Sequence, residues 1–396
     1  MGMEYELAMG FAEFLNVELE IITPDWQEMY SMLKKNKADI IAANLTITDQ
    51  RKSFLEFSDE LIPIQQYIIT HNNQRKLKTE ADLKGQTIHL RKNTSYHERL
   101  LALKENGLDF NMELYDDLPS EEFIRRVSEG EIEITVSDSH IARLNRRYYP
   151  NIRLAFPIEE EQSLGWAVKK GNNGLVEKIN EYFSMIQENG TYDKLFNKYY
   201  GSSEIFDYVD LVKYHDRLES RLPKYEKQIK QESEKYGFDW RMIAATIYQE
   251  SHFNPRAKSY TGVRGLMQLT LVTAKEMGIN NRLDPVQSIR GGVKYLNKIY
   301  KRLGDIDEHD RMKFTLASYN IGYGHIRDAQ KLAELQGLDK NKWASMEITL
   351  PLLRYRKYYK QTKYGYARGT EPVRYVQRIM SYYEILRRQA LNVVEK

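Results

Sequence analysis

The stretch "TIYQESHFNPRAKSYTGVRGLMQLT", residues 246–270, places a single acidic residue, Glu250, at the end of an apolar helical run. Ile243 and Ile247 lie four residues apart and Glu250 follows three later, so the three side chains share one helix face. A carboxyl on an apolar face loses water, which raises its pKa toward the value that a general acid needs at neutral pH. A solvated glutamate at a helix end is the alternative, and the stripe alone leaves both interpretations open.

Four motifs follow one another in the second half of the chain: "ESHFNP", "AKSYTGVRGLMQLT", "ASYNIG" and "RGTEPVRYVQRI". The first three resemble the patterns E-S-x-x-x-P, S-x-x-G-x-x-G-L-M-Q and A-x-Y-N-x-G of the soluble lytic transglycosylase family of lysozyme-like peptidoglycan enzymes. The fourth resembles that family's late Tyr-Val motif. Ordered motifs of this kind are far more specific than any one of them alone.

This resemblance implies an all-α, lysozyme-like domain that cleaves the β-1,4 bond between N-acetylmuramic acid and N-acetylglucosamine. Glu250 would be its catalytic acid and base: it protonates the leaving oxygen, then deprotonates the C6 hydroxyl, which attacks C1 and leaves a 1,6-anhydro sugar. Such chemistry needs one carboxylate, whereas ordinary glycosidases use a pair. The next acid along the chain, Glu276, lies outside all four motifs. The resemblance implies these substrate-binding residues: Ser259, Met267, Gln268, Tyr319, Asn320 and Tyr375.

The first half of the chain alternates helical and strand patterns, which favours α/β architecture with a mostly parallel sheet. Strands are expected at residues 17–22, 39–48, 67–71 and 163–171, among others. From about residue 202 onward every segment has a helical pattern, and this shift is the best sign of a domain boundary. We therefore expect a first domain over residues 1–203 and a second over residues 204–396.

The segment "WQEMYSMLKKNKADIIAANLTITDQRKSFLEFSDELIP" resembles the family 3 periplasmic solute-binding proteins. The resemblance implies two α/β lobes, joined by two crossing strands, with a ligand in the cleft between them. Two departures stand out: the family's first strand is missing, so the domain is N-terminally incomplete by this comparison, and "SDELIP" lacks the usual Pro-Tyr after Asp.

Arg51 is the residue that the resemblance places on a ligand's carboxylate, which a guanidinium can grip with two parallel hydrogen bonds. The second lobe would contribute Thr94 or Ser95, and Asp138 for an ammonium group. The alternative is that Arg51 pairs with Asp49 or Glu56 on a helix surface.

Composition adds few constraints. The 396 residues carry a net charge of +3 and 41% hydrophobic side chains, as in ordinary soluble domains, and no run of apolar residues is long enough to span a membrane. The absence of cysteine excludes disulfides, thiolate metal sites and cysteine nucleophiles. No signal peptide is visible, and we expect no cofactor and no metal.

Residues 354–369, "RYRKYYKQTKYGYARG", combine five tyrosines with six basic residues. Such a tract can bind single-stranded nucleic acid, but the near-neutral chain carries no nucleic-acid fold motif, so we expect no nucleic-acid partner. Two interpretations of this tract remain open: its tyrosines stack on sugar rings, or the tract is a solvated surface without a binding role.

Together the two resemblances predict a regulatory solute-binding domain, with an amino acid or muropeptide as effector, fused to an enzyme that acts on peptidoglycan glycan strands. The family implies a periplasmic protein peripheral to the outer membrane, attached by an anchor absent from this chain. Two rivals stay open: an inactive solute-binding protein anchored to peptidoglycan, and a hydrolytic goose-type lysozyme.

Overall fold

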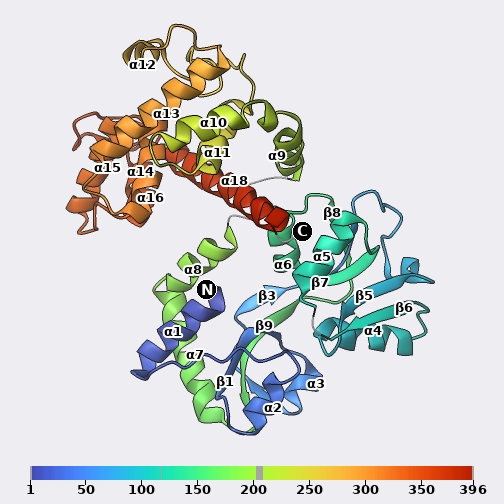
Figure 1. The fold of residues 1–396 in the computed structure, drawn as a ribbon. Coiled ribbons are helices and arrows are strands. Elements are labelled where there is room, and N and C mark those ends of the chain that lie inside the picture. The colour runs from blue at the N-terminus through green and yellow to red at the C-terminus, as the bar shows by residue number, and fades with distance from the viewer. Residues whose placement is uncertain (1, 117, 202–207, 395–396) are drawn as a thin grey trace. The chain divides into compact units, whose positions relative to one another are not determined.

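The computed structural model describes residues 2–116, 118–201 and 208–394. The chain forms two compact units, Met1–Tyr208 and Val209–Lys396 (Figure 1). The boundary expected after residue 203 falls among residues 202–207, outside the described ranges. Each unit is described below by itself.

The first lobe of unit 1 is built around β9 (Gln162–Lys169), the central strand of a four-stranded sheet. Strands β1, β2 and β3 all pair with β9 in antiparallel register. The fully buried Trp166 of β9 packs among apolar side chains from the helices that cover this sheet. The remaining elements of the lobe are α1 (Met3–Leu15), α2 (Met29–Lys34), β1 (Ile40–Thr46), α3 (Asp49–Lys52), β2 (Leu55–Phe57), β3 (Ile62–Ile64), α7 (Asn173–Glu188) and α8 (Thr191–Tyr199).

The second lobe holds a five-stranded sheet in the order β6-β5-β7-β4-β8. Strand β5 runs parallel to β6 and β7, whereas β4 runs antiparallel to β7 and β8. Its elements are β4 (Gln66–His71), η1 (Glu80–Leu83), β5 (Thr87–Arg91), α4 (Ser95–Glu105), β6 (Asn111–Tyr115), α5 (Ser120–Glu129), β7 (Ile134–Asp138), α6 (Ser139–Asn145) and β8 (Ile152–Pro157).

Two expectations about the strands are wrong. Residues 17–22 form no strand, and their apolar side chains are exposed, because no described strand offers them a hydrogen-bonded neighbour. The sheets are also not mostly parallel: of the seven strand pairs described, only β5–β6 and β5–β7 are parallel. The reason is topological, since β9 and β4 each lie among strands that run in the opposite direction.

The described part of unit 2 is helical, as its sequence predicts. Helix α11 packs against α18, and α14 packs against the same α18. Two isolated bridges, Lys258 with Arg264 and Arg264 with Leu269, fold the loop after α11 back on itself. The helices are α9 (Tyr208–Ser220), η3 (Leu222–Lys224), α10 (Glu226–Glu234), α11 (Trp240–Ser251), α12 (Leu271–Met277), α13 (Pro285–Arg302), α14 (Glu308–Ile321), α15 (Tyr323–Leu335), α16 (Trp343–Leu352), α17 (Arg356–Tyr359) and α18 (Thr370–Val394).

Helix α11 carries the glutamate of the opening stretch, and its two ends are set by local chemistry. At the start, the Asp239 carboxylate accepts a hydrogen bond from the Arg241 backbone N–H at 2.9 Å, a side-chain N-cap. At the end, His252 and Phe253 both adopt positive φ, which stops the helix after Ser251. None of the described helices combines the length and the apolar character needed to cross a membrane.

Candidate active site and ligand cleft

Glu250 lies in the last turn of α11, where protein atoms surround its carboxyl while the residue keeps part of its surface exposed. Burial raises the pKa of this carboxyl from the ordinary 4.5 to about 7. The Tyr375 hydroxyl, on α18, donates a hydrogen bond to Glu250 Oε1 and acts on the pKa in the opposite direction. Because the protonated and ionised forms are both populated near neutral pH, this carboxyl can give a proton and take one back.

Two tyrosines lie beside the carboxyl, and each donates one hydrogen bond. Tyr375 is buried and binds Glu250, whereas the Tyr319 hydroxyl donates to the Met267 carbonyl at 2.6 Å. Burial, followed by the nearby Glu250 charge, raises the pKa of both phenols well above the ordinary value. Both therefore stay protonated at neutral pH and act as donors.

The loop after α11 is held by its own polar groups. Gln268 Nε2 donates to the backbone carbonyls of Ala257 and Gly265, at 3.1 and 2.8 Å. The Ser259 hydroxyl shares a hydrogen bond of 2.8 Å with Thr261 Oγ1. Gly265 must be glycine, since its φ is +84° and a Cβ there would lie 1.8 Å from the Arg282 carbonyl oxygen.

Met267 is a core side chain. It is fully buried, and its backbone N–H donates to Ser288 Oγ at 3.2 Å. Helix α13 approaches it so closely that a Cβ at Gly292 would lie 2.5 Å from the Met267 Cβ. The sequence motif marks Met267 but not Ser288, whose sole sequence signal is its place on the buried face of a predicted helix.

The structure thus links some of the predicted site residues through hydrogen bonds and shows no such link to Glu250 for others among the described residues. Glu250 contacts Tyr375, and Tyr319 connects the same region to Met267. Among the described residues, no hydrogen bond links Ser259, Gln268 or the exposed Asn320 to Glu250. Their contact with substrate stays a prediction.

Glu276, the next acidic residue after Glu250, pairs with a lysine and not with Glu250. Its exposed carboxylate forms an ion pair with Lys298 on the neighbouring α13. No group of three His, Asp or Glu side chains within the described ranges could hold a metal ion.

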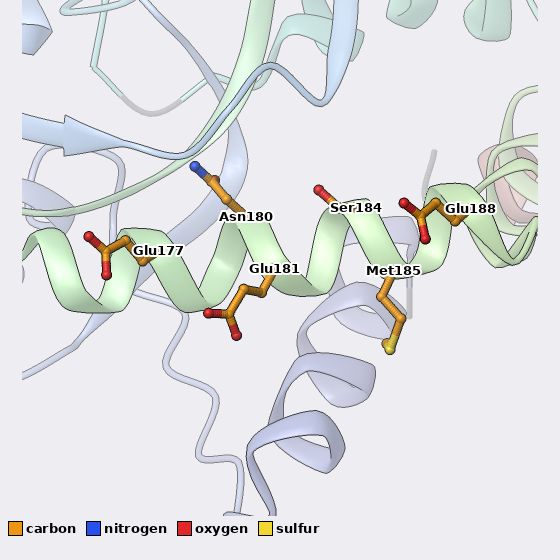
Figure 2. A pocket seen from close by; sticks show the side chains of 6 residues that line it. All are labelled: Glu177, Asn180, Glu181, Ser184, Met185 and Glu188. Atoms are coloured by element: carbon orange, nitrogen blue, oxygen red, sulfur yellow. The ribbon is translucent and has the colours of Figure 1, made fainter.

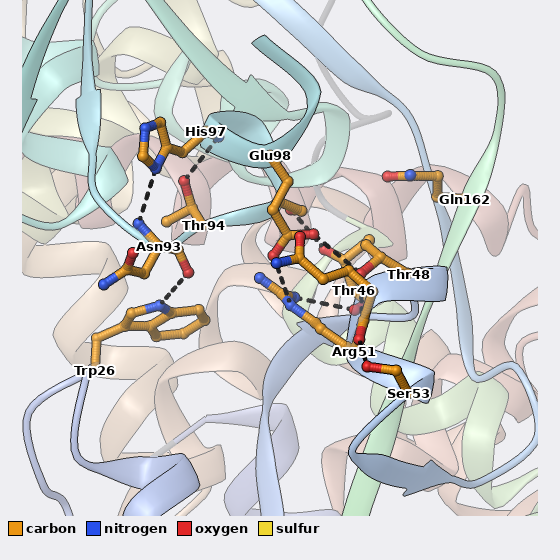
Figure 3. Close-up of polar contacts among 12 residues, drawn as sticks. Trp26, Thr46, Thr48, Arg51, Ser53, Asn93, Thr94, His97, Glu98 and Gln162 are labelled. Carbon is orange, nitrogen blue, oxygen red and sulfur yellow. Dashed lines mark hydrogen bonds and ion pairs between the residues drawn. The ribbon is translucent and has the colours of Figure 1, made fainter. Parts of the chain in front are cut away.

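In unit 1, Arg51 is buried between the lobes, with 2% of its side chain exposed (Figure 3). Its Nη1 donates to the Thr46 carbonyl at 3.0 Å, and its Nε lies 3.2 Å from Glu98 Oε1 of the second lobe. A surface pair with Asp49 or Glu56 is therefore wrong for Arg51, and Glu56 pairs with Lys170 instead.

The other predicted ligand residues divide between structural and cleft positions. Thr94 caps α4, because its hydroxyl accepts from the His97 N–H at 3.3 Å. The Ser95 hydroxyl faces the first lobe, 3.1 Å from Thr46 Oγ1. Burial raises the pKa of Asp138 to about 7, while the Tyr96 hydroxyl and the Arg51 charge act in the opposite direction.

Buried polar atoms of this cleft that have no hydrogen-bond partner among the described residues include Arg51 Nη2, Gln66 Oε1 and Asp138 Oδ1. Unsatisfied buried groups are rare and call for an explanation. A cationic donor beside two acceptors complements a molecule that carries both a carboxylate and an ammonium group.

Two other surface features lie apart from these sites. A hollow of about 640 Å³ follows one side of α7, lined by Glu177, Glu181, Glu188 and three neighbours, and holds none of the predicted site residues (Figure 2). The basic tyrosine tract lies around α17, where Tyr355, Tyr364 and Tyr366 are exposed.

Two protein-family models match successive parts of the chain. Residues 1–202 match the bacterial extracellular solute-binding proteins, family 3, and residues 227–342 match the transglycosylase SLT domain. A mutant of ArgBP from T. maritima is 26% identical over 51% of this chain and 86% of its own, with a TM-score of 0.46.

Relatives are also similar over nearly the whole chain. The membrane-bound lytic murein transglycosylase F of Desulfosudis oleivorans is 50% identical over 98% of this chain and 86% of its own length. The protein of the same name from Stutzerimonas stutzeri is 41% identical over 97% of this chain and 80% of its own. Because this identity extends over nearly the whole sequence, the chain belongs to the membrane-bound lytic murein transglycosylase F family.

Proposed function

We propose that this chain, a peptidoglycan lytic transglycosylase by family, cleaves the β-1,4 bond between N-acetylmuramic acid and N-acetylglucosamine and leaves 1,6-anhydromuramic acid ends. The observation that carries the proposal is the Glu250 carboxyl in the last turn of α11, which accepts a hydrogen bond from the Tyr375 hydroxyl and whose pKa burial raises to about 7. A single group with that pKa can serve as acid in one step and as base in the next.

The reaction divides into two proton transfers. Protonated Glu250 gives its proton to the glycosidic oxygen as the bond to C1 breaks, and the neighbouring acetamido group relieves the positive charge on C1. The Glu250 carboxylate then takes the proton of the C6 hydroxyl, whose oxygen bonds to C1 and closes the anhydro ring. Tyr375 holds the carboxyl in position through its hydrogen bond to Oε1. Water enters neither step, in contrast with hydrolytic glycosidases.

Mass spectrometry of digested sacculi tests this proposal. Anhydro ends support it, reducing ends would indicate a hydrolytic lysozyme, and no products would indicate an inactive binding protein. Glu250→Gln should lower the cleavage rate by at least ~10³-fold, as expected when the single acid is lost. Glu276→Gln, which alters an exposed acid on the same unit, is the matched control and should cleave at the wild-type rate.

Unit 1 is proposed to bind an effector with a carboxylate and an ammonium group, an amino acid or a muropeptide, and to change the rate of cleavage by unit 2. Arg51, Ser95 and Asp138 would contact it, with Thr94 holding the helix that carries Ser95. An effector changes the rate only if it binds the two states of the protein unequally. Candidate muropeptides and amino acids should therefore raise the unfolding temperature and change the cleavage rate; if no candidate moves either quantity, the effector role is lost.

The cellular site proposed is the periplasm, peripheral to the outer membrane, because peptidoglycan lies there. Fractionation of cells with antibody detection tests this placement. Recovery in the cytoplasmic fraction would contradict it.

A further inference from the structure

A carboxylate of the second lobe contacts two donor groups of the first lobe that could bind a ligand. Glu98, on α4, places Oε1 3.2 Å from Arg51 Nε, and its Oε2 accepts a hydrogen bond of 3.0 Å from Thr48 Oγ1 (Figure 3). A guanidinium and a hydroxyl that face one carboxylate form the same donor set that the carboxylate of a bound ligand would need.

The contact crosses between the lobes at a place of low exposure. Arg51 belongs to α3 of the first lobe, and 2% of its side chain and 23% of that of Glu98 are exposed. Two other contacts between the lobes join neutral groups: Trp26 Nε1 donates to the Asn93 carbonyl at 3.1 Å, and the Thr46 and Ser95 hydroxyls lie 3.1 Å apart. A third joins the Gln27 amide to the exposed Asp116 carboxylate at 3.1 Å. The Coulomb attraction within an ion pair is larger where water is excluded, and removal of one partner leaves the other charge buried and uncompensated.

We propose that Glu98 is a built-in competitor of the effector: its carboxylate occupies the anchor formed by Arg51 and Thr48 and holds the two lobes closed when no ligand is bound. An incoming carboxylate that takes both Arg51 Nε and the Thr48 hydroxyl must displace it, because two carboxylates cannot share these two donors. This inference rests on the proposed effector role of unit 1 and deepens it.

The consequence is a threshold for effector binding. A ligand can bind only those molecules in which the anchor of Arg51 and Thr48 is free. Its apparent affinity is therefore its intrinsic affinity multiplied by the fraction of such molecules. A ligand carboxylate that binds Arg51 well can displace Glu98, whereas a neutral ligand cannot replace the charge of Glu98. Glu98 thereby selects for anionic groups at this end of the cleft.

Lobe closure in the absence of ligand gives a direct test. Because the chain has no cysteine, spin labels can be placed in the full-length protein by Lys37→Cys and Glu113→Cys, both at exposed positions on different lobes. Pulsed electron resonance then measures the distance between the lobes. Glu98→Gln should raise the ratio of open to closed molecules by about fivefold, the order expected for a partly shielded ion pair.

The matched control is Glu105→Gln, which removes the same charge from an exposed position on the same helix. It should keep the wild-type distance distribution. If Glu98→Gln also keeps it, with both variants folded by circular dichroism, Glu98 does not hold the lobes and the proposal is overturned.

A second variant asks whether a carboxylate is what the anchor needs. In Glu98→Ala, added acetate should restore the short distance, while sodium chloride at equal concentration should not; no response to acetate would contradict the proposal. The measurement uses neither effector nor peptidoglycan, so its outcome is separate from that of the cleavage and effector assays.

Discussion

The pKa of Glu250 sets the first prediction at the scale of a single residue. Because the acid must be protonated and burial raises its pKa to about 7, kcat/KM should fall as the pH rises through about 7. Rates of release of soluble muropeptides between pH 5 and 9 measure this. A rate that stays flat from pH 5 to 9 would contradict the assignment of Glu250 as the acid.

The same shift affects stability. The folded protein holds the Glu250 proton up to about pH 7, whereas an ordinary carboxyl loses it near 4.5, so the folded state binds more protons between these values. Stability therefore falls as the pH rises from about 4.5 to about 7, since ionisation of a buried carboxyl costs free energy. The Glu250→Gln variant should lose this contribution to the pH dependence, as denaturant unfolding at several pH values would show.

Tyr375→Phe tests how the carboxyl is held. The phenol hydrogen bond lowers the Glu250 pKa, so its removal should move the descending limb of the pH–rate profile to higher pH. Tyr383→Phe is the matched control on the same helix, because its hydroxyl donates to Asp239 at 2.9 Å and not to Glu250. A limb that moves equally in both variants would show that the effect is not local to Glu250.

At the scale of elements, the approach of α13 to the loop that carries Met267 decides the packing behind the site. Gly292→Ala would force a Cβ to within 2.5 Å of the Met267 Cβ, so we expect a loss of ~1–3 kcal/mol in the free energy of unfolding. Cleavage should fall as well, since the Met267 carbonyl accepts the hydrogen bond of Tyr319.

Gly304→Ala is the control for that variant. A Cβ at this exposed glycine meets only the Lys301 carbonyl oxygen, at 3.5 Å, so its stability should change by less than ~0.5 kcal/mol. Denaturant titration of the two variants measures the difference. Equal losses would show that the close approach to Met267 is not what makes Gly292 necessary.

At the scale of the whole molecule, the two units each have a core of their own, which favours separate unfolding. We expect calorimetry to show two thermal transitions. A ligand of unit 1 at a hundredfold excess over its Kd should stabilise that unit by ~2.7 kcal/mol and leave the other transition in place. Hydrogen exchange followed by mass spectrometry assigns each transition to its residues, and a single transition would contradict the prediction.

The sequence by itself determined the order of two architectures, and it predicts Glu250 as the catalytic acid. Residue types at fixed spacings carry that information, because a helix repeats every 3.6 residues and because the four motifs keep their order. The strand predicted from the sequence at residues 17–22 does not form. These residues have the composition of a strand, but a strand exists only where a neighbouring strand offers hydrogen bonds.

Only the tertiary structure decided which groups meet. The link between Glu250 and Tyr375 joins residues 125 positions apart, and the pair of Arg51 with Glu98 joins two lobes; neither has a local sequence signal. Burial in the tertiary structure also decided the pKa of Glu250, because this pKa depends on the atoms packed around the carboxyl. A motif identifies the residue but not its surroundings.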